Sequence, residues 1–153
     1  MSQLVSGRGK PLGSGRIYPA GSVRDSELAT LIASYKQNVA GTYICVSPKS
    51  IAATIPDGKH IVSTKVDGEQ WFLSKGGDGA VLLSPNGKAI TGTHVHVMKE
   101  ASRLLHGWTG VLAGELYATV DAGRPRVFDL HSAMGSGASA QVDRLRFAVF
   151  DIL

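Results

Sequence analysis

The chain has 153 residues, of which 43% are hydrophobic and 18% are charged, and this composition is typical of one globular domain with a core. It has no run of the roughly 18 apolar residues that a membrane span needs, and no secretory signal, so we expect a cytoplasmic protein without a membrane partner. The single cysteine, Cys45, excludes an intramolecular disulfide and multi-cysteine zinc sites, and we expect it to be buried. The net charge of +4 is compatible with a polyanionic partner.

The first part of the chain is predicted to hold one helix and one short strand. Residues 1–20 are rich in Gly, Ser, Arg and Lys, so we expect a flexible basic arm, with the folded unit over residues 21–153. Helical spacing predicts a helix over 25–37, with Asp25 or Ser26 as its N-cap and an apolar stripe of Leu28, Leu31, Ile32 and Tyr35. A strand is predicted over 43–46, and a turn or a single helical turn over 48–55.

The second part of the chain alternates apolar runs with turn signals. Strands are predicted over 60–66, 70–74, 80–84 and 88–90, because Gly-containing turns such as Asn86-Gly87 separate them. A second helix is predicted to run to about Leu105, with Thr93 as its cap. Further strands are expected over 110–119, 126–130 and 145–153, the last of them buried. These elements predict the α+β class, with antiparallel sheets and flanking helices.

Three short motifs contain residue types suited to nucleotide chemistry. Lys65-Val66-Asp67-Gly68 places a lysine before a tight turn, and a neutral lysine amine is a nucleophile toward phosphorus. Gly114-Glu115-Leu116 offers a carboxylate oxygen for a hard cation, and Phe150 offers an aromatic face for a base. Considered singly, each also fits an ordinary structural role: an exposed hairpin lysine, a solvent-facing glutamate and a core phenylalanine.

In this order the motifs resemble motifs I, III and IIIa of the covalent nucleotidyltransferases, with Glu115 placed 115 − 65 = 50 positions after Lys65. The family contains ATP-dependent DNA ligases, RNA ligases and mRNA capping enzymes. The resemblance covers residues 61–153, and the ending Val149-Phe150-Asp151-Ile152-Leu153 favours the DNA ligases. It implies the N-terminal part of an adenylation domain with the ATP-grasp-like nucleotidyltransferase fold of that family.

The resemblance also implies an activity and a set of site residues. Lys65 would form a lysyl-AMP intermediate with ATP and Mg²⁺, and AMP would then pass to the 5′-phosphate of a DNA nick, in repair or replication. Glu115 would contact the ribose and the metal, and Phe150 would stack on the base. The nucleotide-binding residues implied are Ser63, Thr64, Val66, Asp67, Gly68, Gln70, Glu115 and Phe150.

The sequence departs from the family pattern at several positions. Gln70 and Pro85 stand where ligases commonly have arginines, Ala113 replaces an aspartate, and Ser63 replaces a glutamate. The later family strands, with a glutamate and two lysines, and the OB domain do not follow, so we expect a fragment that the missing C-terminal part of the same protein would complete. An RNA ligase, a capping-type guanylyltransferase and a catalytically dead nucleic-acid-binding module remain alternatives.

Overall fold

A seven-stranded antiparallel sheet organises the computed structural model, which describes residues 4–77 and 79–153. The strand order is β1-β2-β5-β4-β3-β6-β7. The strands are β1 (Lys10–Leu12), β2 (Gly15–Tyr18), β3 (Glu69–Gly76), β4 (Gly79–Leu83), β5 (Ala89–Thr91), β6 (Gly110–Ala118) and β7 (Leu145–Ile152). The helices are α1 (Ser26–Asn38), α2 (Ile51–Thr54), α3 (His96–Leu104) and α4 (Val127–Met134). The predicted α+β class with an antiparallel sheet is therefore confirmed.

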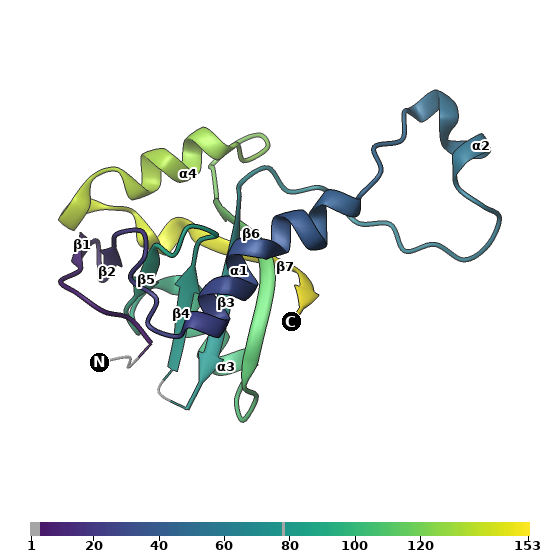
Figure 1. Ribbon diagram of the computed structural model, residues 1–153. Helices are drawn as coiled ribbons and strands as arrows, with labels where there is room; N and C mark the ends of the chain where they lie inside the picture. The colour runs from purple at the N-terminus through teal and green to yellow at the C-terminus, as the bar shows by residue number, and fades with distance from the viewer. Residues whose placement is uncertain (1–3, 78) are drawn as a thin grey trace.

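Two cores lie on the two faces of this sheet, because successive strand residues point to opposite faces. On one face Trp71 and Leu73 of β3 belong to the core that α3 and α4 cover. On the other face Phe72 packs with α1, and the Tyr35 ring meets the Phe72 ring edge-on with centroids 5.4 Å apart. Helix α1 thus lies over one face, and α3 and α4 lie over the other (Figure 1).

Residues 10–18 form a β-hairpin, which differs from the expected flexible arm. Strand β2 pairs with β5, and Gly13, with a φ of 53°, turns the chain between β1 and β2. Leu12 is only 1% exposed and Tyr18 is also buried, so these few apolar side chains anchor a segment whose composition looks disordered. Residues 1–3 of the expected arm lie outside the described residues.

The predicted strands over 43–46 and 60–66 are wrong. Residues 43–66 form an extended loop that leaves the sheet after α1 and returns at β3, and it contains the helical turn predicted over 48–55 (Figure 1). Ile61 and Val62 are exposed there, and Cys45 is exposed instead of buried. The β-branched residues of these two stretches favour a strand. Within the described residues, however, no neighbouring strand pairs with them, and the preference of such residues for strands depends on pairing.

The predicted strand over 126–130 is also wrong, because this segment begins helix α4. Asp129 accepts a hydrogen bond from the Arg126 backbone N–H at 2.8 Å and so caps the helix start. Leu130 and Ala133, three residues apart, are buried in the core. The five-residue window that we interpreted as a strand was too short to reveal this helical spacing.

The remaining predicted elements are confirmed within a few residues. Asp25 caps α1 as expected, accepting hydrogen bonds from the backbone N–H groups of Glu27 and Leu28 at 3.0 Å. Helix α3 begins at His96 with Val95 at its N-cap position, so the predicted Thr93 cap is wrong. Strand β7 pairs with β6 alone and exposes Phe150 and Ile152, so the expectation that this strand is buried is wrong. No helix in the described ranges combines the length and apolar character that crossing a membrane requires.

Candidate functional site

A cavity of about 470 Å³ lies where the extended loop meets the sheet, beside the end of α1. Every implied nucleotide-site residue except Asp67 and Gly68 lines it. The lining residues are Ala40, Tyr43, Ser63, Thr64, Lys65, Val66, Gln70, Glu115, Ala148, Val149 and Phe150. The fold therefore brings residues from all three motifs to one cavity.

Strand register explains why Gln70, Glu115 and Ala148 share this wall. Gln70 of β3 pairs with Glu115 of β6, and Glu115 pairs with Ala148 of β7. The neighbouring pair on the same face, Phe72 with Ala113, belongs to the core under α1. Side chains two positions apart on a strand point to the same face of the sheet. Gln70 and Glu115 therefore lie on the face that α1 covers, at the edge of that core.

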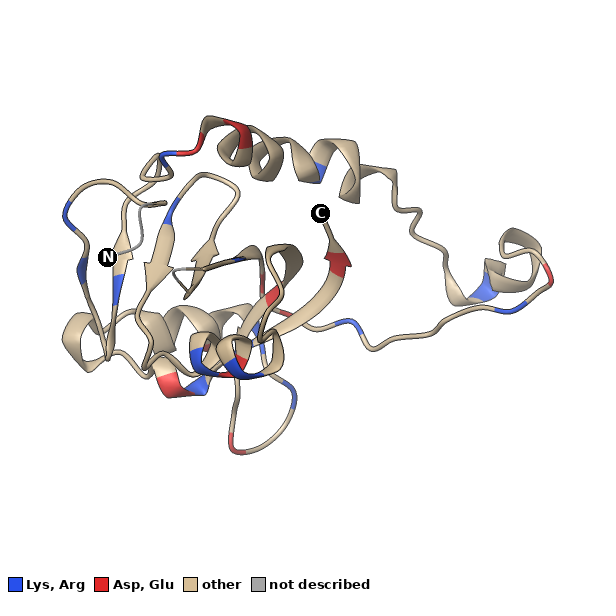
Figure 2. Cartoon of the chain, turned by 90° about the horizontal axis from the view of Figure 1, so that it is seen from below, with Lys and Arg blue, Asp and Glu red and all other residues tan. Residues whose placement is uncertain are grey.

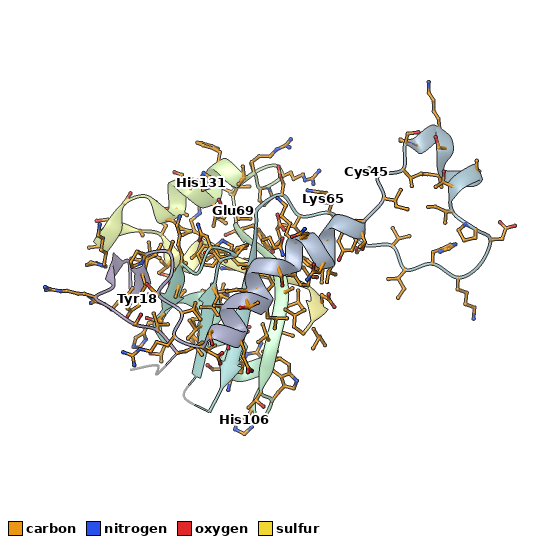
Figure 3. The ribbon with its side chains drawn as sticks, in the orientation of Figure 1. Tyr18, Cys45, Lys65, Glu69, His106 and His131 are labelled. Carbon is orange, nitrogen blue, oxygen red and sulfur yellow. The ribbon has the colours of Figure 1, made fainter. Side chains whose placement is uncertain are left out.

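Lys65 lies in the returning part of the extended loop, and not at the end of a strand as predicted (Figure 3). Arg124 Nη2 donates a hydrogen bond of 2.6 Å to the Lys65 carbonyl oxygen. Two residues further on, Asp67 pairs with Arg126, with Nη1 and Oδ2 separated by 3.4 Å. Asp67 is therefore engaged with the segment before α4 and does not line the cavity.

Glu115 is the carboxylate of this cavity, and its surroundings favour the protonated form. Burial raises the pKa of Glu115 above its ordinary value, although the Gly68 hydrogen bond and the Lys65 charge act in the opposite direction. The Gly68 N–H donates to Glu115 Oε1 at 3.1 Å. One carboxylate oxygen is therefore fixed by the backbone of the lysine motif, which links the first and second motifs directly.

Both motif glycines occupy positions where a side chain would clash. A Cβ at Gly68 would lie 2.1 Å from the Leu116 carbonyl oxygen, so the lysine motif runs directly against β6. A Cβ at Gly114 would lie 2.6 Å from both the Ala148 carbonyl oxygen and the Phe147 ring. These glycines allow the close approach that brings the motifs together.

Gln70 has an unusual environment for an amide side chain. Its Nε2 atom is buried and has no hydrogen-bond partner among the described residues. A buried donor without a partner costs about 1–3 kcal/mol, so such groups in native proteins commonly await a ligand or a water. Gln70, which lines the cavity, therefore holds a buried donor that no described residue pairs with.

Sequence reasoning missed Tyr43, Arg124 and Arg126. Tyr43 lines the cavity and is 62% exposed, but it lies in a segment interpreted as a strand. Burial, a 2.7 Å hydrogen bond to Asp151 and the neighbouring Tyr43 raise the pKa of Tyr35, so these three side chains interact beside the site. Arg124 lies between two predicted strands and Arg126 lies within the predicted strand over 126–130, and no local pattern connects them with the lysine motif.

We compared the chain with models of known protein families, with curated proteins and with solved structures, and none of these comparisons found a match.

Proposed function

We propose that this chain carries the nucleotide site of an ATP-dependent DNA ligase-type adenylyltransferase. The observation that supports it best is the meeting of Lys65, Glu115 and Phe150, from three motifs far apart in the sequence, around one cavity. A volume of about 470 Å³ falls within the range of roughly 300–1,000 Å³ that is common for small-molecule sites.

Each of these side chains has a role that its chemistry supports. Phe150 is 48% exposed, and stacking of its ring on a planar base would remove apolar surface from water. The Glu115 carboxylate can accept hydrogen bonds from ribose hydroxyl groups, and the unpaired Gln70 amide can donate to an acceptor of the nucleotide.

The reaction would proceed in three displacements at phosphorus. The neutral Lys65 amine attacks the α-phosphate of ATP, so an N–P bond forms, the bond to the β-phosphate breaks, and pyrophosphate leaves while the amine loses a proton. An oxygen of a DNA 5′-phosphate then displaces the lysine and accepts AMP. Finally the 3′-hydroxyl of the neighbouring strand end displaces AMP and seals the nick.

The residues of the cavity are also compatible with Mg²⁺. The described residues contain no group of three or more His, Cys, Asp or Glu side chains placed to hold a metal ion. Mg²⁺ commonly uses one or two carboxylates together with substrate phosphates and water, and Glu115 would supply that carboxylate. When bound with ATP, the ion would neutralise phosphate charge.

Covalent labelling tests this proposal. We expect the protein to retain label from α-³²P-ATP with Mg²⁺ after denaturation, and Lys65→Ala and Lys65→Arg to retain none, because the arginine side chain keeps its charge and is no nucleophile. Label from GTP instead would indicate capping chemistry. No label from either nucleotide, with all proteins folded by circular dichroism, would contradict the proposal and favour the nucleic-acid-binding module.

A further inference from the structure

A second pocket, of about 360 Å³, shares the Gln70 wall with the nucleotide cavity. Its other walls come from the end of α1, the start of β3 and the turn between β4 and β5. The lining residues are Lys36, Glu69, Gln70, Trp71, Ser84, Pro85, Asn86 and Lys88. Because Gln70 lines both spaces, a molecule bound in the nucleotide cavity lies next to this pocket.

Two lysines give this pocket an excess of positive charge. The ammonium groups of Lys36 and Lys88 form no hydrogen bond or ion pair within the described residues, and both side chains are exposed. The one carboxylate here, Glu69, is already engaged: Oε1 is 2.6 Å from His131 Nε2, and Oε2 accepts from Trp71 Nε1 at 3.2 Å (Figure 3). The charge of Lys88 also acts on Glu69, but no hydrogen bond or ion pair among the described residues holds either lysine, so both can turn to an external anion.

The turn that carries Lys88 is held by its own hydrogen bonds. Ser84 N–H donates to the Lys88 carbonyl oxygen at 2.9 Å, and Lys88 N–H donates to Ser84 Oγ at 3.0 Å. Gly87 has a φ of 76°, which glycine adopts without strain, and Ser84 Oγ also donates to Asn86 Oδ1 at 2.6 Å. The backbone that presents Lys88 is thus fixed, which reduces the entropy cost of binding there.

The buried Gln70 Nε2 is a second, independent sign of a ligand at this wall. It is a donor without an acceptor among the described residues, and an anion would supply one. Lysine binds phosphate as a point charge, so Lys36 and Lys88, which line the same pocket as Gln70, can neutralise the charge of such an anion.

We propose that Lys36, Lys88 and the Gln70 amide form a phosphate-binding subsite next to the nucleotide cavity. This inference rests on the proposed adenylyltransferase function. The phosphate belongs either to the β/γ end of ATP or to the 5′-phosphorylated end of the DNA strand. Lysines and arginines are dispersed around the molecule (Figure 2), so the net charge alone would not have located this subsite.

The two sources of phosphate are distinguished by measuring two steps separately. We expect K36Q/K88Q to slow at least one step about tenfold, and Lys99→Gln, an exposed lysine on α3, to change neither. Slower lysyl-AMP formation with a raised KM for ATP would assign the subsite to ATP. Slower AMP transfer to a nicked, 5′-phosphorylated duplex alone would assign it to the DNA strand. Unchanged rates in both steps, or an equal loss in Lys99→Gln, would overturn the inference.

A binding titration keeps this inference testable if lysyl-AMP does not form, an outcome that would itself count against the proposed function. Inorganic pyrophosphate is titrated calorimetrically into the wild type, K36Q/K88Q and Lys99→Gln at low salt. We expect about tenfold weaker binding in K36Q/K88Q alone. Absence of millimolar binding by the wild type, or equal affinity in all three proteins, would overturn the subsite.

Discussion

At the scale of single residues, Glu115 combines the role that we propose for it with a cost in stability. Burial raises the pKa of its carboxyl, so the folded protein binds this proton more tightly than the unfolded chain does. The folded state therefore loses stability as the pH rises from about 4, the ordinary glutamate value, through the raised pKa of the folded protein. Above that range the penalty is fully present.

Replacing Glu115 with glutamine is expected to stabilise the protein at neutral pH. Glutamine cannot ionise, and its carbonyl oxygen can still accept the hydrogen bond from the Gly68 N–H. Thermal unfolding of both proteins between pH 4 and pH 8 should give Glu115→Gln the higher Tm at pH 7, with a gap that narrows on acidification. A gap that stays constant with pH, or a lower Tm for the variant at pH 7, would count against this account. The same variant should lose lysyl-AMP formation.

At the scale of elements, Gly114 sets the spacing between β6 and β7. An added Cβ would lie 2.6 Å from the Ala148 carbonyl oxygen, a backbone atom that cannot move without shifting β7. We expect Gly114→Ala to lower the free energy of unfolding by about 1–3 kcal/mol, as overpacking commonly does.

A matched strand glycine provides the control for Gly114→Ala. A Cβ at Gly76, at the end of β3, would meet nothing within 4 Å, so Gly76→Ala should be neutral. Urea unfolding of the two variants and the wild type measures the difference. Equal midpoints for all three proteins would show that β7 accommodates the methyl group.

Strand pairing explains which strand predictions were correct and which were wrong. The strands that pair in the central sheet, such as β3 and β6, were predictable, because their residues alternate between two cores. The stretches over 43–46 and 60–66 are richer in β-branched residues than β3 and β6 but have no partner strand among the described residues, and a local window cannot supply that information. The reverse error affected β1 and β2, because β1 pairs with β2 and β2 pairs with β5, and this pairing orders a Gly-rich segment.

The candidate site was predictable only in part for a related reason. The motifs identified Lys65, Glu115 and Phe150, because each has a residue type suited to one chemical role. Tyr43 and Arg124 reach the site through the path of the extended loop and through the turn before α4. Such long-range contacts leave no periodicity in the sequence, so they require the three-dimensional structure.

At the scale of the whole molecule, the extended loop joins the site to the most exposed part of the fold. Both of its ends line the proposed nucleotide cavity, with Tyr43 at one end and Ser63 to Val66 at the other. Its middle, around Lys59, is exposed and carries few buried side chains (Figure 1). Segments with few buried contacts unfold locally most easily. A ligand that contacts both ends of the extended loop should therefore reduce the local unfolding of this loop.

Limited trypsin digestion tests this coupling between ligand and loop. We expect the first cut in the free protein at Lys59 or Lys49, and we expect saturating ATP to slow it severalfold by holding the loop ends against the sheet. Mass spectrometry of the first fragments identifies the cut, and Lys59→Gln should remove the Lys59 product alone. If bound ATP, verified by calorimetry, left the rate of loop cleavage unchanged, the loop ends would not belong to the nucleotide site.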